Sequence, residues 1–156
     1  MAFGGSGFFT ASIADILGNT AALDWGSATW NIALFSNSAT PDFTVASAST
    51  AYGAGVWASN EVTGTGWSAG GPTLATSAPA TESPAAGQVK LDATDVSETG
   101  TTLSAARGAL IYMGSLTTPV VDQGLLVVDF GGDYSTTNGT FAITWDANGV
   151  AYFDVW

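Results

Sequence analysis

The stretch LSAARGALIYM, residues Leu103–Met113, is the longest strand-like run in the chain, and QGLLVVDF, residues Gln123–Phe130, is the strand-like run that follows it. The centre of the second stretch is a row of aliphatic residues, Leu125–Val128. A short aliphatic run without alternation is typical of a strand that is buried on both faces. We therefore expect these two stretches to form the core of a β-sheet.

Further stretches show strand patterns of apolar and β-branched residues. They are Thr29–Phe35, Gln88–Leu91, Phe141–Trp145 and Val150–Val155. The last two are separated by Asp146-Ala147-Asn148-Gly149, and Asn-Gly is a strong hairpin signal because both residues tolerate a positive φ. We expect the two C-terminal strands to form a β-hairpin around this turn.

Only one segment has a clear helical period. Its apolar residues recur at i, i+4, i+7 and i+8, and they are Phe9, Ile13, Ile16 and Leu17. Thr10 or Ser12 can serve as the N-cap and Gly18 as the stop, so we expect a short helix over 9–18. Such a helix needs a sheet or another neighbour to cover its apolar stripe. The Gly-rich leader, residues 1–8, is expected to be flexible.

Glycine-rich turns separate the strand patterns. They fall at Gly64, Gly66, Gly70–Pro72, Gly131–Gly132 and Asn138–Gly139. Short strands, frequent turns and one helix predict a mostly β fold: an antiparallel β-sandwich or barrel-like domain with one short N-terminal helix. The 156 residues fit a single domain, in which 29–156 form the sandwich.

Two stretches fit the strand pattern poorly. Ser47–Ser59 contains Ala, Tyr and Trp and is compatible with either one helical turn or an open loop. Ala75–Gly87 contains Pro79 and Pro84, so we expect an exposed loop. It does not read as a domain linker, because strands on both sides of it are needed to complete one core.

The chain is poor in charge and strongly acidic. Charged residues make up 10% of it, against about 25% in ordinary soluble domains. Thirteen acidic residues against Lys90 and Arg107 give a net charge of −11, which argues against binding to nucleic acids or anionic membranes. A surface with so few charges suits a subunit that stays assembled with partners. Each cation is expected to pair with a nearby carboxylate, Arg107 at the sheet surface or at a subunit boundary.

The composition also bears on catalysis. The chain has no Cys and no His, which removes disulfides, thiolate metal sites and the commonest general base. A Ser-His triad is excluded for the same reason. We therefore expect a non-enzymatic protein without a cofactor. No apolar run approaches the roughly 20 residues that a membrane-spanning helix needs.

Two acidic clusters are candidate sites. Asp92, Asp95 and Glu98 offer the oxygen ligands that calcium prefers, but their spacing is not that of an EF-hand loop, and a solvated turn is the preferred interpretation. Asp129 and Asp133 flank a Gly-Gly pair; paired carboxylates hydrolyse glycosides when they lie about 5–10 Å apart. Acids beside glycine usually form hydrogen-bonded turns instead. We therefore assign no catalytic and no metal-binding residue.

Aromatic residues supply the candidate contact surface. Trp30 and Trp145 lie within strand patterns and are expected in the core, whereas Trp57 and Trp67 flank Gly-rich loops and are expected at a contact surface. Trp156, the last residue of the sequence, either pins the chain end or docks on a neighbour. The candidate interface residues are Phe8, Phe9, Ile13, Trp57, Trp67 and Trp156.

Three stretches carry a family resemblance. They are Glu61–Gly71 (EVTGTGWSAGG), Leu91–Val96 (LDATDV) leading to Ala106–Tyr112 (ARGALIY), and Asp129–Gly132 (DFGG) leading to Asn138–Gly149 (NGTFAITWDANG). In this order, after an N-terminal helix and a WNIALF strand, they resemble a family of small tailed-phage virion proteins, often described only as structural or minor capsid proteins. The resemblance covers nearly the whole chain, and its motifs are turns and strand edges rather than catalytic signatures.

The resemblance implies a virion protein at the capsid surface, a head decoration or minor capsid protein that coats or stabilises the shell. The expected partners are the major capsid protein and further copies of the chain itself in a homo-oligomer. The helix around Phe9–Leu17 and the Gly-rich leader are the parts expected to touch the shell. Two alternatives stay open: a tail or fibre component, and a carbohydrate-binding adhesion module that uses Trp57 and Trp67.

Overall fold

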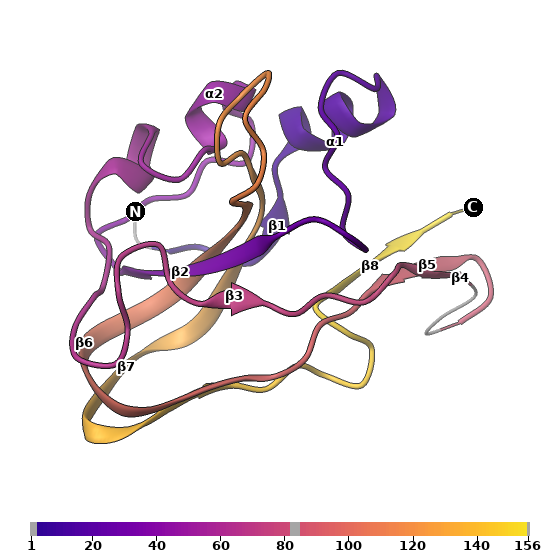
Figure 1. Ribbon diagram of the computed structural model, residues 1–156. Helices are drawn as coiled ribbons and strands as arrows, with labels where there is room; N and C mark the ends of the chain where they lie inside the picture. Colours follow the sequence, from indigo (N-terminus) through magenta and orange to yellow (C-terminus); the bar gives the residue numbers. More distant parts are fainter. Residues whose placement is uncertain (1–2, 82–84, 156) are drawn as a thin grey trace.

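Two antiparallel sheets pack against each other in the structure, a computed structural model that describes residues 3–81 and 85–155 (Figure 1). The larger sheet has the strand order β1-β7-β6-β2-β3 and the smaller one β4-β5-β8. The strands are β1 (Gly7–Phe8), β2 (Trp30–Ser36), β3 (Thr73–Leu74), β4 (Ala80–Thr81), β5 (Gln88–Leu91), β6 (Val96–Met113), β7 (Gly124–Ile143) and β8 (Ala151–Asp154). The helices are α1 (Thr10–Leu17), α2 (Ser47–Thr50) and the 3₁₀ helix η1 (Gly55–Ala58). The expected mostly β fold with a short N-terminal helix is confirmed, and both sheets are open.

Strands β6 and β7 form one long hairpin, which is the backbone of the larger sheet. Val96 lies opposite Ile143 at its open end, and Tyr112 lies opposite Gly124 near its closed end. Beside the closed end, β2 pairs with β6 and β1 pairs with β7. The two stretches that predicted the sheet core, Leu103–Met113 and Gln123–Phe130, therefore lie within neighbouring strands at its centre.

The residues of β2 alternate between two hydrophobic clusters on opposite faces of the larger sheet. Trp30, Ile32 and Leu34 belong to one cluster, which extends to the smaller sheet. Ala33 and Phe35 belong to the other, which η1 and the N-terminal segment cover. All five side chains are fully buried. The period of two in a strand sends alternate residues to opposite faces, so a strand that is apolar at every position needs cover on both.

Strand β7 continues beyond Phe130, where the sequence pattern predicted that the strand ends and a turn follows. Gly131 and Asn138 have positive φ, as expected for turns, but the chain does not reverse there and both lie within β7. They lie where the pairing of β6 with β7 shifts register, so they act as bulges that bend the hairpin. Phe141–Trp145, expected as a separate strand, is in large part the end of β7. A positive φ is needed by a bulge as well as by a turn, so the local signal did not distinguish the two.

The predicted C-terminal hairpin is wrong, although its turn forms. The Gly149 N–H donates to the Asp146 carbonyl at 2.8 Å, and Gly149 has a φ of +86°. After this turn the chain joins the smaller sheet, where β8 pairs with β5 and Ala151 lies opposite Leu91. The Asn-Gly signal sets the local turn, whereas the strand partner is set by the apolar side chains that β8 buries against the larger sheet.

Residues 3–8, the described part of the leader that was expected to be flexible, pack against the rest of the chain. Phe3 is 4% exposed and its ring meets the ring of Trp57 edge-on at 6.4 Å. Gly7 and Phe8 form β1 and pair with Val127 and Leu126. A buried aromatic ring and a strand pairing are the contacts that hold a chain end against a domain.

Helix α1 forms where the sequence predicted a helix, and the two ambiguous stretches contain short helices and a short strand. α1 forms over Thr10–Leu17 and Gly18 is its C-cap as predicted, but the N-cap is Phe9 and no side chain caps the helix. In 47–59 the helical alternative is confirmed, since this stretch contains α2 and η1. The loop expected at Ala75–Gly87 includes a short strand, in which Ala80 lies opposite Lys90, and residues 82–84 lie outside the described part.

Candidate functional site

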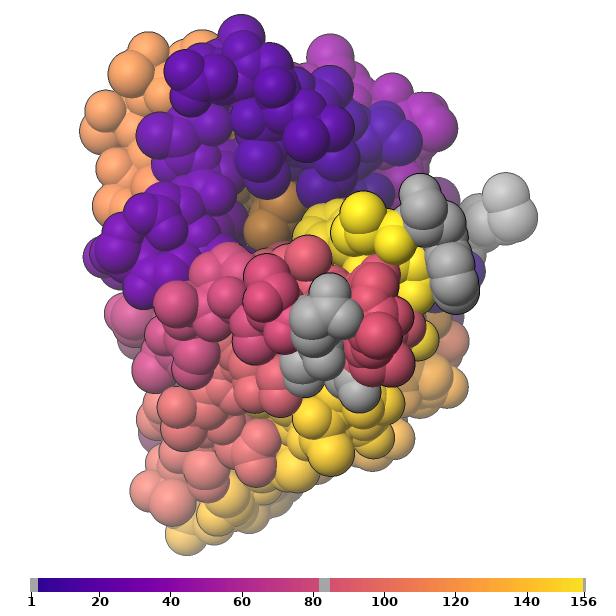
Figure 2. All heavy atoms as spheres, turned by 90° about the vertical axis from the view of Figure 1, so that its right-hand side faces the viewer, coloured from indigo at the N-terminus to yellow at the C-terminus, as the bar shows by residue number. Residues whose placement is uncertain are grey.

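An apolar groove of about 510 Å³ lies between α1 and the smaller sheet. In Figure 2, α1 (indigo) and the smaller sheet (crimson and yellow) stand on two sides of a hollow, and part of β7 (orange) is visible at its bottom. Buried residues form the floor, among them Leu23, Trp25, Leu91 and Leu125. The groove therefore opens directly onto the hydrophobic cluster between the sheets.

The rim of the groove carries exposed aliphatic side chains. Leu17 at the end of α1 is 82% exposed, Ile16 is 38% exposed, and Val155 beyond β8 is 62% exposed. Isolated exposed aliphatic residues are ordinary, but an apolar rim around an apolar floor marks a contact surface. This groove is the strongest candidate functional site among the described residues.

α1 exposes its apolar end because its polar side chains are held inward. The Ser12 hydroxyl donates to the Gly124 carbonyl at 2.6 Å, and Ser12 is the buried residue of the helix. The Asp15 carboxylate accepts hydrogen bonds from the Gln123 amide at 2.8 Å and from the Ser47 hydroxyl at 2.5 Å. These bonds tie the polar side of α1 to β7 and α2. Ile16 and Leu17 are consequently turned toward the groove and the solvent.

The charges near the groove are acidic. Among the described residues, Asp24 is the one ionisable residue that lines it, and its carboxylate accepts hydrogen bonds from the backbone of Gly26 and Ser27 and from the Ser27 hydroxyl. The hydrogen bond from the Ser27 side chain is the largest of the causes that lower the pKa of Asp24. On α1, the hydrogen bonds from Ser47 and Gln123 lower the pKa of Asp15. Both carboxylates stay ionised at neutral pH, so the groove carries a negative charge at Asp24.

Three of the expected interface residues lie in the core, and this part of the expectation is wrong. Phe9 is fully buried, and Trp57 and Trp67 are each 2% exposed. Trp57 packs edge-on against Phe35 at 4.9 Å, and Trp67 packs edge-on against Phe141 at 5.5 Å. The Gly-rich loops beside both Trp residues fold back over the sheet, so glycine content did not indicate exposure of the neighbouring ring.

The other three expected interface residues lie in different parts of the chain. Phe8 is half-buried and stacks on Phe153 at 4.5 Å, which joins the two sheets. Ile13 is half-buried and lines the groove. Trp156 lies outside the described residues. Of the remaining groove residues, Ile16 and Leu17 belong to the predicted helical stripe, but no sequence signal pointed to Leu23 or to Val155.

The residues expected in the core and the expected ion pairs are largely confirmed. Trp30 is fully buried, and Trp145 is half-buried against the inter-sheet cluster. Lys90 pairs with Asp92 at 2.7 Å, and the Arg107 Nε lies 3.0 Å from an Asp129 oxygen.

The acidic clusters are dispersed into separate interactions. Asp92 is engaged by Lys90, while the Asp95 carboxylate accepts a hydrogen bond from the Trp145 N–H at 2.9 Å. Asp129 accepts a hydrogen bond from the Gly131 N–H at 2.9 Å, the turn geometry expected for an acid beside glycine. Within residues 3–81 and 85–155, no group of three or more acidic side chains is placed to hold a metal ion.

Comparison with known proteins adds no relative: the chain matches no protein-family model, no curated protein and no solved structure. In the described part of the chain, none of the helices has the length and apolar character to cross a bilayer.

Proposed function

We propose that the chain is a non-enzymatic structural subunit of a tailed-phage particle that decorates the capsid surface and docks on the shell through the groove beneath α1. The observation that carries the docking site is the apolar rim of Ile16, Leu17 and Val155 above a buried apolar floor. The assignment to a phage particle is supported by the resemblance of Glu61–Gly71 and the other stretches to virion structural proteins.

The groove is suited to an apolar segment of the shell protein. Apolar surface removed from water contributes about 25 cal/mol per Å², so an aliphatic side chain that enters the groove and covers Leu17 stabilises the complex. Anchors of this kind, seated in a pocket and surrounded by a polar rim, carry most of the binding energy of protein interfaces.

The acidic charge at the groove indicates which residues should flank that apolar segment of the shell protein. The ionised Asp24 lines the groove, and the chain as a whole carries a charge of −11. A segment with Lys or Arg on either side of its apolar residues complements this negative charge and is steered toward it. A shell presents many equivalent copies of such a segment, which matches the expected homo-oligomer of decoration subunits on a symmetric surface.

A tail or fibre component is the remaining alternative within the particle. Copy number separates the two: densitometry of purified particles gives many copies per head for a decoration protein and few for a tail component. The sugar-binding version that relied on Trp57 and Trp67 loses its basis, because both rings are buried.

The location is tested by asking whether the chain sediments with heads that lack tails. Retention on tail-less heads is expected, and recovery with tails alone would overturn the proposal of a decoration protein.

The groove is tested with Leu17→Asp, which places a charge on its rim without disturbing the core. We expect Leu17→Asp to lose head binding by at least about tenfold, as for a central interface residue. The matched control is Val121→Asp, because Val121 is 58% exposed and does not line the groove. Thermal melting should show both variants folded. Equal head binding by the two variants would reject the groove as the docking site.

A further inference from the structure

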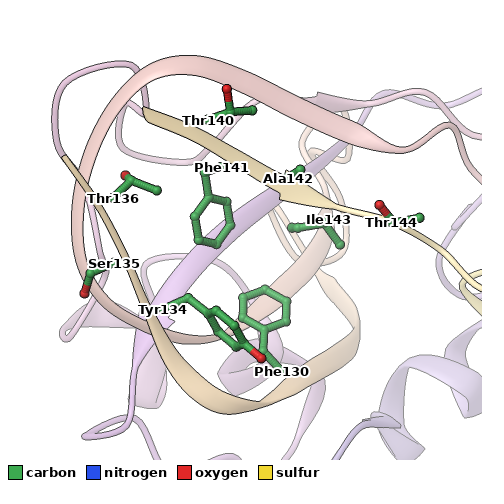
Figure 3. Close-up of a pocket in the computed structure, with 9 residues that line it drawn as sticks. All are labelled: Phe130, Tyr134, Ser135, Thr136, Thr140, Phe141, Ala142, Ile143 and Thr144. Atoms are coloured by element: carbon green, nitrogen blue, oxygen red, sulfur yellow. The ribbon is translucent and has the colours of Figure 1, made fainter. Parts of the chain in front are cut away.

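A second depression, of about 550 Å³, lies inside the curve of the outer part of β7. In Figure 3, Phe130, Tyr134, Phe141 and Ile143 point into this curve from its two arms. It is separate from the groove beneath α1, and none of its lining residues lines that groove. Its volume falls within the range of small-molecule sites in proteins.

The aromatic rings form a continuous platform with one open face. Phe130 meets Tyr134 edge-on at 6.3 Å and lies 6.2 Å from Phe141. Phe141 is 5% exposed, whereas Tyr134 is 53% exposed. Rings that contact each other leave no gap between them for a caged cation, so the aromatic surface available to a ligand is the ring of Tyr134.

Polar groups border the platform. The Thr136 and Thr101 hydroxyls lie 2.9 Å apart and share a hydrogen bond, and the Thr101 hydroxyl also lies 3.2 Å from the Gly139 carbonyl oxygen. Within the described part of the chain, no group bonds to the Tyr134 hydroxyl. β7 is also paired only with β6 beyond Asp129 among the described residues, so its other edge offers unpaired backbone donors and acceptors.

The irregular edge of β7 decides against an added peptide strand. Gly131 and Asn138 have positive φ, and the pairing of β6 with β7 shifts register along this stretch. Bulges break the regular spacing that a strand needs for pairing and blunt a sheet edge. A ligand that uses this edge must therefore tolerate unevenly spaced hydrogen-bonding groups.

The lining residues carry no charge, and the chain is strongly acidic, which disfavours an anion. A purely apolar ligand would leave the Tyr134 hydroxyl and the strand edge unpaired. A sugar ring presents a face of C–H groups, which packs on an aromatic ring, and a rim of hydroxyls, which both donate and accept. We propose that this depression binds a neutral saccharide, with one ring stacked on Tyr134 and its hydroxyls bonded to the Tyr134 hydroxyl and to the free edge of β7.

The experiment is a titration of the folded chain with a panel of neutral glycans: linear β-glucans, mannan and chitin oligosaccharides, followed by ¹⁵N NMR and calorimetry. We expect at least one probe to bind and to shift the amide signals of residues 130–144. Tyr134→Ala should weaken that binding about tenfold, while Tyr134→Phe, which keeps the ring, should weaken it less.

Tyr152→Ala is the matched control, because Tyr152 is 46% exposed and lies in β8 away from this depression. Its affinity should equal that of the parent. No binding to any probe at millimolar concentration, or equal losses for Tyr134→Ala and Tyr152→Ala, would overturn the proposal. The Leu17→Asp variant should bind saccharide normally, so the saccharide site and shell docking can fail independently.

Discussion

The two halves of the β6–β7 hairpin share the same strands but differ in how neighbouring elements cover them. In the inner half, Leu110 and Ile111 are fully buried, because β2 and β1 cover the outer edges of the two strands. In the outer half, bulges bend the strands, one edge of β7 is open, and Tyr134 is 53% exposed. Strand pairing alone therefore does not produce a buried core. A core also requires neighbouring elements that cover both edges and both faces of the paired strands.

The first test of this comparison removes a buried side chain from the inner half. Ile111→Ala should destabilise the protein by about 2–5 kcal/mol, because it deletes methyl groups from a fully packed position and leaves a cavity. Thr140→Ala, at an exposed position of the outer half, should change the free energy of unfolding by less than about 0.5 kcal/mol. Urea unfolding measures both values. Similar losses for the two variants would mean that the halves do not differ as described.

The second test adds a methyl group instead of removing one. A Cβ on Gly108, in the inner half, would lie 2.4 Å from a Phe3 ring carbon and 2.5 Å from the Val128 carbonyl. Gly108→Ala should therefore cost about 1–3 kcal/mol through overpacking.

Gly132→Ala provides the matched control in the outer half. A Cβ there would meet only the Tyr134 ring, at an ordinary 3.7 Å. The melting temperature should fall for Gly108→Ala and stay near that of the parent for Gly132→Ala. A tolerated Gly108→Ala would show that the leader yields easily and that Phe3 contributes little to the core.

The smallest expected effect lies at the closed end of the hairpin. Burial raises the pKa of Asp122 above its ordinary value, so the folded state favours the protonated carboxyl. Its contribution to stability is complete below the ordinary pKa and is lost as the pH rises through the raised one. Asp122→Asn should therefore stabilise the protein at neutral pH by less than about 1 kcal/mol.

Asn is a suitable replacement because Asp122 has a φ of +53°, a conformation that Asn also adopts readily. Melting curves at neutral pH and near pH 3 measure the effect. The advantage of Asp122→Asn should disappear in acid, where the parent carboxyl is also protonated. An advantage of equal size at both pH values would contradict a burial effect on ionisation.

Much of the fold followed from local patterns. The alternation in Thr29–Phe35 and the short strand candidate Gln88–Leu91 predicted β2 and β5, and the spacing of Phe9 and Ile13 predicted α1. The candidate site was harder to predict. Among the described residues proposed for an interface, Ile13 alone lines the groove, because exposure of Trp57 and Trp67 was inferred from neighbouring glycines. A flanking glycine indicates where the chain bends, whereas the burial of the neighbouring Trp ring depends on which residues the bend packs against it.

The sequence by itself determined the strand and helix segments, the low charge, and the absence of His and Cys chemistry, because periodicity and composition are local properties. The tertiary structure decided the rest. Gly131 and Asn138 became bulges rather than turns, β8 paired with β5, and Ser12 rather than Leu17 was buried in α1. These outcomes depend on long-range pairing and packing, which select among the conformations that each local signal allows.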